Sequence, residues 1–244
     1  MGEGRFLIVD GLDGSGKGVV IDALRNYLED NELKIFDLRE YWKEHNDIPE
    51  LSQIQEYDVI CSSEPTFSMV GKVIREEIVR DNQRKYSALS TAHAFALDRE
   101  ILYKKLLMPA RQAGKIIIQE RGVITSIVYQ PVQRERINLK DLINLPGNRL
   151  ALKNSPDLLL IIKVEPMEVM RRLKERAKKD HAIFENLLFQ RKVEQRYESD
   201  WLRKLFEQFK AKVIYLDTNP PLTVTDTKET AVNIWKDHMV DVEK

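Results

Sequence analysis

Residues 11–17 read Gly-Leu-Asp-Gly-Ser-Gly-Lys, which places two glycines five positions apart and a lysine directly after the second. Glycines let several backbone N–H groups approach phosphate oxygens at once, because no Cβ obstructs them, and lysine adds a point charge. The segment follows an apolar run over residues 6–10 and precedes a helical pattern, so a helix N-terminus adds a favourable dipole. This spacing and context predict a loop that binds nucleotide phosphates.

Position 18 departs from the motif, because it is a glycine where a Ser or Thr normally supplies a hydroxyl to magnesium. Two interpretations stay open. Magnesium is held through water and other carboxylates, or the chain binds nucleotide with weak catalysis. The residues expected to contact ATP are Gly11, Leu12, Asp13, Gly14, Ser15, Gly16, Lys17, Gly18 and Val19.

The elements that must position this loop follow from the hydrophobic pattern. Short runs of Ile, Val, Leu and Phe alternate with longer segments in which apolar residues recur every three or four positions. Continuous apolar runs are typical of parallel strands that are covered by helices on both faces. We expect one α/β domain over residues 1–244, with a five-stranded parallel sheet between helices in three layers. The expected strands are 6–10, 34–38 or 57–62, 115–119, 158–164 and 213–217.

Composition narrows the function classes. Among the 244 residues, 39 Lys and Arg balance 39 Asp and Glu, which argues against a partner that is polymeric nucleic acid but not against small anionic ligands. The one cysteine, Cys61, indicates a reducing compartment and excludes a thiol-rich metal site. The longest aliphatic run, 158–162, is too short to span a membrane, and we recognise no targeting segment. We therefore expect a cytoplasmic protein without a membrane partner.

Two segments have unbalanced charge. Residues 40–58 contain six acids against the single base Lys43, which is typical of a solvated insertion that elaborates the surface. Residues 171–179 are the opposite, with Glu175 the only acid. Such a basic run is usually a wet helix face. Its basic residues are Arg171, Arg172, Lys174, Arg176, Lys178 and Lys179.

Several further segments, in one order, make the sequence resemble the thymidylate kinase family of P-loop nucleoside monophosphate kinases. The first is spaced like the family's Arg-Glu-Pro-Gly-Gly-Thr segment, the second like Phe-Ala-Ala-Asp-Arg and the third like its Asp-Arg-Tyr signature. The match covers residues 6–217. The matching residues are Glu64-Pro65-Thr66 with Gly71, Ile74 and Arg75; residues 95–99; Glu120-Arg121-Gly122 with Thr125, Tyr129 and Gln130; residues 156–164; and Phe184-Glu185 with Val193 and Tyr197.

The resemblance implies ATP-dependent phosphorylation of a deoxynucleoside monophosphate, dTMP to dTDP, by a magnesium-dependent homodimer. It assigns Arg75 and Arg121 to the acceptor phosphate, a role that suits the planar fork of guanidinium donors. Phe95 would stack on the acceptor base and Arg99 would bond its edge. For each residue the alternative is a structural role in the core or on the surface. The remaining expected acceptor contacts are Asp13 at the sugar hydroxyl, Tyr129 and Gln130 in the base pocket, and Glu64 and Thr125.

We expect the charged catalytic residues to be Lys17, residues at the end of one strand, and cations of a helical lid over residues 171–185. Glu120 follows the strand at 115–119, and the carboxyl ends of parallel strands face the ligand crevice, so it is expected to be a functional acid. It is also the one protein candidate for holding magnesium, through water. Position 14 is glycine, so the chain resembles members whose cations come from the lid. The lid candidates are Arg172, Arg176 and Lys178, which would close over ATP and exclude water.

Departures from the family pattern fall on the acceptor side and the metal. Ser63 stands where the family segment has an arginine, and Thr66 and Phe67 stand where it has two glycines. Glu120 replaces an aspartate and Gly122 an aromatic residue. Residues 182–183 lack the Asp-Arg of the family lid. The preference for the acceptor base is therefore less constrained by the sequence than the fold is.

Two alternatives to the monophosphate kinase stay open. A deoxynucleoside kinase would use the pair at 120–121 as a base and a cation for a sugar 5′-hydroxyl, and would not need Arg75. A nucleotide-binding protein with reduced catalysis would explain Gly18. A signalling GTPase is disfavoured, because no Asn-Lys-x-Asp guanine box occurs in the chain.

Overall fold

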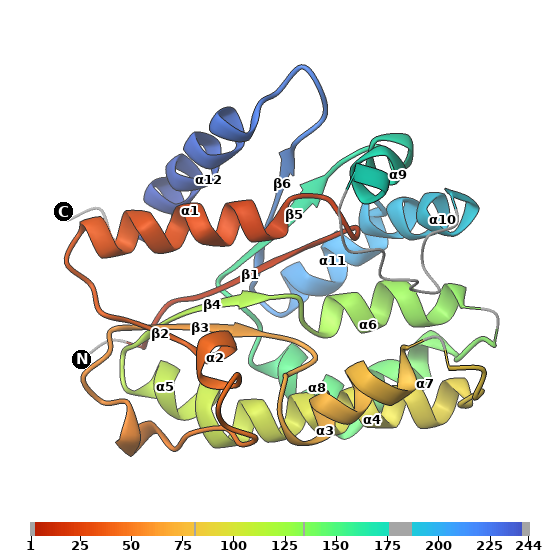
Figure 1. Ribbon diagram of the computed structural model, residues 1–244, viewed down its shortest axis with the longest axis horizontal. Coiled ribbons are helices and arrows are strands. Elements are labelled where there is room, and N and C mark those ends of the chain that lie inside the picture. Colours follow the sequence, from red (N-terminus) through yellow and green to blue (C-terminus); the bar gives the residue numbers. More distant parts are fainter. Residues whose placement is uncertain (1–2, 81, 134, 176–186, 241–244) are drawn as a thin grey trace.

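The computed structural model describes residues 3–80, 82–133, 135–175 and 187–240. Its centre is a parallel sheet of six strands in the order β2-β3-β4-β1-β5-β6. The sheet runs through the middle of the molecule in Figure 1. The strands are β1 (Phe6–Gly11), β2 (Ile35–Asp37), β3 (Val59–Ser63), β4 (Ile116–Glu120), β5 (Leu158–Lys163) and β6 (Lys212–Asp217).

The expected parallel sheet is confirmed, but its strand number is six where five were expected. The two segments treated as alternatives, 34–38 and 57–62, both form strands and pair with each other, Ile35 opposite Val59. Strand β2 is only three residues long and lies at the sheet edge, where it pairs on one side. The Asp58 carboxylate accepts a hydrogen bond from Lys34 N at 2.9 Å and so fixes the start of this short strand.

Twelve α-helices are found in the described residues, and none is long and apolar enough to cross a membrane. They are α1 (Lys17–Asp30), α2 (Leu38–Tyr41), α3 (Met69–Val73), α4 (Ala88–Leu102), α5 (Met108–Gln112), α6 (Val123–Tyr129), α7 (Leu139–Asn144), α8 (Pro146–Lys153), α9 (Pro166–Glu175), α10 (Leu187–Tyr197), α11 (Asp200–Gln208) and α12 (Val224–Met239). Short 3₁₀ turns η1 (Leu51–Gln53) and η4 (Gln130–Val132) and π-helical turns η2 (Ile74–Ile78) and η3 (Tyr103–Leu107) complete the elements.

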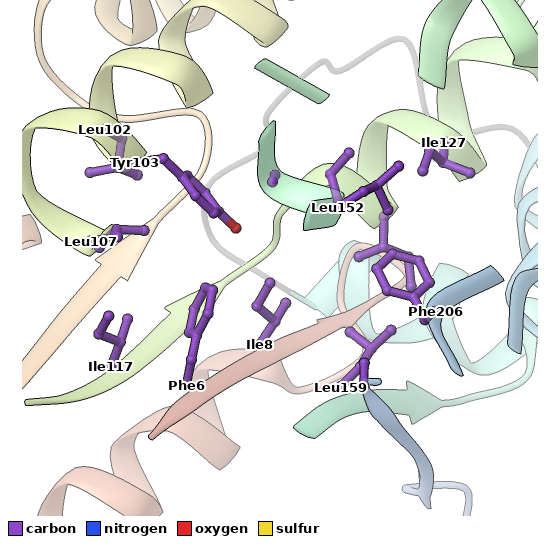
Figure 2. Packing of buried hydrophobic residues seen from close by; sticks show 14 of the residues in the cluster. Phe6, Ile8, Leu102, Tyr103, Leu107, Ile117, Ile127, Leu152, Leu159 and Phe206 are labelled. Carbon is purple, nitrogen blue, oxygen red and sulfur yellow. The ribbon is translucent and has the colours of Figure 1, made fainter. Parts of the chain in front are cut away.

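Helices cover both faces of the sheet, which explains the continuous apolar strands. Helices α1 and α12 lie side by side on one face, and α4, α5, α6 and α8 lie on the other (Figure 1). Successive residues of a strand point to opposite faces. Leu7 and Val9 of β1 therefore join the cluster under α1 and α12, whereas Phe6 and Ile8 join the larger cluster on the other face. Figure 2 shows Phe6 and Ile8 in that cluster beside Tyr103.

The register of the strands sets which polar residues meet at the carboxyl edge. Glu120, the last residue of β4, lies opposite Val9 on one side and Ser63 on the other. Asp10 follows Val9 and lies opposite Ile161 of β5. The ends of β1, β3 and β4 therefore bring Asp10, Ser63 and Glu120 to one edge, which is the edge where α1 begins.

The acidic segment 40–58 is not only the solvated surface elaboration that its charge indicates. It contains little regular structure, yet Trp42, Ile48 and Ile54 are all buried in the core cluster that also contains Ile8. The Trp42 indole N–H donates to Asp47 O at 2.9 Å, which satisfies its polar end. The apolar residues between the exposed acids therefore anchor this segment in the core.

Candidate active site

The loop between β1 and α1 has the backbone that a phosphate cradle requires. Gly11, Gly14 and Gly16 have φ values of 146°, 79° and 101°, a region that disfavours residues with a Cβ. Lys17 is buried and its Nζ donates to Leu12 O at 2.8 Å and Gly11 O at 3.2 Å. Burial, with repulsion from Arg121, lowers the pKa of Lys17 to about 8. Because burial destabilises the charged ammonium, an anionic ligand beside it would stabilise that charge.

Asp10, which the sequence reasoning missed, supports the loop through hydrogen bonds at the end of β1. Its carboxylate is fully buried and accepts three hydrogen bonds: from Gly11 N at 2.7 Å, from Thr125 Oγ1 at 2.6 Å and from the Tyr197 hydroxyl at 2.8 Å. These bonds tie the loop to α6 and α10. The sequence could have indicated Asp10, because it is an acid at the carboxyl end of a buried strand and such ends face the ligand crevice. Thr125, which was predicted to contact the acceptor, lies in this supporting network.

Arg121 and Asp13 meet between the loop and the end of β4. The Arg121 guanidinium donates to the Asp13 carboxylate and lies 3.7 Å from Asp10 Oδ1. Burial opposes its charge, but the carboxylates of Asp13 and Asp10 raise the pKa of Arg121 well above its ordinary value. Arg121 has φ of 63°, a sparsely populated conformation that costs about 1–3 kcal/mol and clusters at active sites. Its guanidinium also lies 5.8 Å from the centre of the Tyr129 ring.

Arg75 lies in the π-helical turn η2, and π-turns recur at functional sites. Its Nε donates to Pro65 O and Thr66 O, both at 3.0 Å, and its guanidinium stacks 3.6 Å from the centre of the Phe67 ring. Burial and repulsion from Arg121 lower the pKa of Arg75 to about 10. Phe67, which replaces a glycine of the family segment, therefore fixes the plane of this guanidinium.

A buried polar network lies behind the predicted base pocket. Arg99 is 1% exposed, and it donates to Glu64, Ser126 and the Asn148 side-chain oxygen. Gln119 Nε2 also donates to Glu64, at 3.0 Å. Burial raises the pKa of Glu64 to about 7, while the charge of Arg99 opposes this rise. The predicted acceptor contacts Arg99 and Glu64 are thus paired with each other in the interior.

The other predicted base-pocket residues lie on α4, α6 and the turn after α6. Phe95 is half-buried on α4, three positions before Asp98, which accepts from Thr66 N at 2.8 Å. Tyr129 and Gln130 are 5% and 4% exposed. The Tyr129 ring lies 6.0 Å from Phe189 of α10, between ring centres. Phe95 and Tyr129 therefore come from α4 and α6, two helices that contact each other.

A cavity of about 450 Å³ opens on the other side of the loop, a size typical of small-ligand pockets. Arg172 of α9 lines it and donates to Thr218 O at 2.5 Å and to Glu168 Oε1 at 2.7 Å. Its Nη1 also donates to Ser15 O at 3.4 Å, so α9 rests against the loop, as Figure 1 shows. The other two lid candidates, Arg176 and Lys178, lie outside the described residues. So do Phe184 and Glu185.

Comparison with known proteins shows the family of the chain. A family described as thymidylate kinase matches residues 45–228. A thymidylate kinase from Caldicellulosiruptor saccharolyticus is 30% identical over 191 residues, which cover 78% of this chain and 80% of that protein. A probable thymidylate kinase from Pyrococcus abyssi is 29% identical over 241 residues, 97% and 98% of the two chains.

The chain belongs to the thymidylate kinase family. It is therefore a nucleoside monophosphate kinase. The solved thymidylate kinase of Candida albicans has the same fold, with a TM-score of 0.66 at 18% identity, covering 97% of this chain and 93% of its own. The family match begins at residue 45, after the phosphate loop, so the loop is established by its own motif and backbone.

Magnesium, which the family resemblance implies, would find few protein ligands among the described residues. Within the described ranges, no three His, Cys, Asp or Glu residues gather as a metal site. Asp10 is occupied by three donors, and Asp13 is paired with Arg121. Glu120 is 26% exposed, and among the residues that the structure describes it forms one ion pair, with Arg39 at 3.7 Å. Because Mg²⁺ keeps several waters and takes only one or two carboxylates beside phosphate oxygens, Glu120 fits it through water.

The thymidylate kinase site contains residues that sequence reasoning overlooked besides Asp10. Thr218 follows β6, is buried, and bonds both Arg172 and Ser15 O, the latter at 3.1 Å. Arg39 reaches the site from α2, at the position directly before the segment 40–58. Neither lies in a recognisable motif, so only the strand-end position of Thr218 and the charge of Arg39 could have indicated them.

Proposed function

We propose that this chain transfers the γ-phosphoryl group of ATP to dTMP, giving ADP and dTDP, with magnesium. The observation that carries the proposal is the convergence of three partly or fully buried cations at the end of β4. Burial, and then repulsion from Arg121, lower the pKa of both Lys17 and Arg75. Like charges that are held close without water destabilise one another, and phosphate groups between them would relieve that cost.

The geometry supports a division of the site into two phosphate-binding parts. The glycine loop and Lys17 offer backbone N–H groups and an ammonium to the donor phosphates. Arg75 and Arg121, on the other side of Asp13, offer two planar guanidinium groups to the acceptor phosphate. We propose that Asp13 releases Arg121 to the acceptor phosphate and turns to the acceptor sugar hydroxyl.

In the proposed reaction an anionic oxygen of the acceptor phosphate attacks the γ-phosphorus. The bond between the γ-phosphorus and the β–γ bridging oxygen breaks, and ADP takes the electron pair. The nucleophile is already charged, so no side chain has to remove a proton. Lys17 and Arg121 cancel charge on the phosphoryl group in flight, and positioning does most of the remaining work. Arg172, Arg176 and Lys178 remain the proposed lid cations that exclude water.

When bound, magnesium would supply positive charge that offsets the negative charge of the ATP phosphates. Glu120 is the proposed carboxylate that holds it through water, in the absence of a hydroxyl at position 18. The ideal Cβ position at Gly18 has no atom within 4 Å, so space for a side chain exists. The glycine therefore removes a ligand without being required by packing.

The proposed base pocket consists of Phe95, which would stack on thymine, with Tyr129 and Gln130 beside the sugar. Arg99 and Glu64 would act from behind, by holding Ser126 and the surrounding backbone in place. The stacking surface on α4 is open enough to receive a ring, because Phe95 is only half-buried. Base stacking on an aromatic ring contributes about 1–3 kcal/mol.

We also propose a homodimer in the cytoplasm. Leu89 and Leu97 lie two helical turns apart on the outer side of α4 and are 54% and 50% exposed; Val73 of the contacting helix α3 is 53% exposed. A second copy of α4 would cover this stripe, since large exposed apolar patches mark interaction sites. The single cysteine, Cys61, is buried and unpaired, which fits a reducing compartment. The partners remain small nucleotides, not polymeric nucleic acid.

The test is a coupled assay of ADP release with ATP, magnesium and a panel of nucleoside monophosphates and nucleosides. We expect dTMP to be the best acceptor and nucleosides to be inactive. Arg75→Ala should lower kcat/KM for dTMP by about 10- to 100-fold, because charged hydrogen bonds to phosphate contribute about 1.5–3 kcal/mol. A preferred nucleoside acceptor that is indifferent to Arg75 would favour the deoxynucleoside kinase. ATP binding without any transfer would favour the binding protein.

A further inference from the structure

Arg39 reaches the active-site edge from outside every motif of the chain. It lies in α2, directly after the short edge strand β2, and its Nη1 is 3.7 Å from Glu120 Oε2. Both side chains are about one-quarter exposed, at 25% and 26%, so the pair lies at the rim of the crevice. A contact of this length is an ion pair and not a hydrogen bond. The attraction therefore restrains the carboxylate without fully occupying it.

Asp37 fixes the Arg39 side chain. The Asp37 carboxylate accepts from Arg39 N at 2.8 Å, Nε at 3.3 Å and Nη2 at 3.1 Å, which leaves Nη1 directed to Glu120. Arg25 of α1 donates to the same carboxylate at 2.9 Å, and its second ion pair is with Glu29. Burial opposes the charge of Arg39, but Asp37 and then Glu120 raise its pKa. A guanidinium held at so many points is an anchor and not a mobile surface charge.

The position of Arg39 coincides with a departure in the neighbouring strand. Ser63 of β3 lies in register with Glu120 of β4, and it stands where the resembling family segment has an arginine. A side chain at 63 would start from the strand residue beside Glu120. Arg39 approaches Glu120 from α2, directly after β2, which is the next strand outward. The guanidinium missing from β3 is thus supplied by the helix that follows the neighbouring strand.

We propose that Arg39 is a positioning residue that holds the Glu120 carboxylate at the rim, away from Lys17 and Arg75, and that it replaces the arginine missing at position 63. Glu120 attracts both of these cations, since its charge favours the charged form of each. A carboxylate that is free to turn inward would compete with phosphate for them. The inference rests on the proposed function, because it assigns Lys17 and Arg75 to nucleotide phosphates.

The first experiment measures the Kd of dTMP by calorimetry and kcat and KM by the coupled assay in wild type, Arg39→Ala and Arg25→Ala. We expect Arg39→Ala to raise Kd and KM for dTMP about tenfold, as loss of one restrained charge pair costs about 1.4 kcal/mol. Arg39→Lys, which keeps the charge, should recover most of the loss. Arg25→Ala removes a cation from the same Asp37 cluster and should match wild type. Equal values for Arg39→Ala and wild type would overturn the proposal.

A double-mutant cycle separates this role from a structural one. In the Glu120→Gln background no carboxylate remains to restrain, so Arg39→Ala should leave the Kd of dTMP unchanged. An equal rise in both backgrounds would overturn the proposal, because Arg39 would then act without Glu120. Ser63→Arg, combined with Arg39→Ala, should restore affinity. A double variant with wild-type Tm but without restoration would show that position 63 is not equivalent.

Failure of the inference is distinguishable from failure of the proposed function. A wild-type protein that binds dTMP without transferring phosphate contradicts the function alone, and the same Kd values still decide the role of Arg39. If the wild-type protein prefers another monophosphate, that monophosphate replaces dTMP in both experiments. Transfer to dTMP that is indifferent to Arg39→Ala contradicts the inference alone.

Discussion

Ten consecutive residues, 10–19, build the proposed donor side of the active site, whereas the acceptor side takes its side chains from segments spread over residues 64–148. The donor side works mainly through backbone, in which three glycines adopt φ values that other residues avoid. The acceptor side works through side chains, and some of these are held by partners from other elements. Arg75 rests on Phe67, and Arg99 bonds Asn148.

The contrast also appears in where the chain departs from its family. Most departures, at Ser63, Thr66, Phe67, Glu120 and Gly122, fall on the acceptor side. There one side chain can be exchanged for another that reaches the same place, as Phe67 does under Arg75. A backbone cradle offers fewer such exchanges, because its geometry depends on the chain itself. Gly18 is the exception, and it lies at the mouth of the loop with open space around its Cβ position.

The largest effect is expected from Arg99→Ala, which should lower the stability of the protein. This result would show that Arg99, on the acceptor side, is a structural residue of the core. The change leaves Glu64 buried without its cation, and breaking a buried pair costs about 3–5 kcal/mol of stability. Urea unfolding at pH 7.5 measures it. Lys104→Ala, which removes an exposed pair with Glu100, is the control and should change stability little. Native stability with a raised KM for dTMP would instead make Arg99 a direct base contact.

Lys17→Ala is expected to lower kcat by about 100- to 1,000-fold, the usual cost of removing one electrostatic stabiliser of a transition state. Stability should hold, because burial already lowers the pKa of Lys17 and its charge serves the ligand and not the core. Steady-state assays and thermal melts of the same preparation measure both. Lys228→Ala on the exposed side of α12 is the control. An unfolded Lys17→Ala variant would contradict this division of labour.

Phe95→Ala tests whether the acceptor pocket binds a base. Loss of a stacking surface should raise KM for dTMP about tenfold, within the range of 1–3 kcal/mol for base stacking, and leave KM for ATP unchanged. Two-substrate kinetics give both constants from one data set. Equal changes in the two constants would indicate that Phe95 is a core residue.

The smallest effect expected is a pH dependence confined to the donor side. Lys17 has a lowered pKa of about 8, so its charge, present at pH 7, is lost as pH rises toward 9. The affinity of the free enzyme for ATP should fall about fivefold over this interval, since the lost charge faces the phosphates. Calorimetry at constant ionic strength measures it. The matched variant Lys17→Met should bind weakly with no such slope, and a slope that persists would belong to another group.

Particular residues show how much could be predicted. The apolar runs located every strand, but they could not show that both 34–38 and 57–62 would pair, because an edge strand of three residues carries a weak pattern. The six acids of 40–58 indicated solvent, while Trp42, Ile48 and Ile54 between them are buried. Charge patterning reports the exposed side of a segment and says little about its anchors.

The sequence by itself determined the phosphate loop, the parallel sheet and the membership in a nucleotide kinase class. These depend on short-range spacing, on glycine conformation and on the continuity of apolar runs. Only the tertiary structure decided that Asp10 supports the loop, that Arg99 is enclosed with Glu64, and that Arg39 faces Glu120. Such contacts join residues that are 35 to 187 positions apart, and a carboxylate pairs with whichever cation the packing brings within reach, which no local spacing specifies.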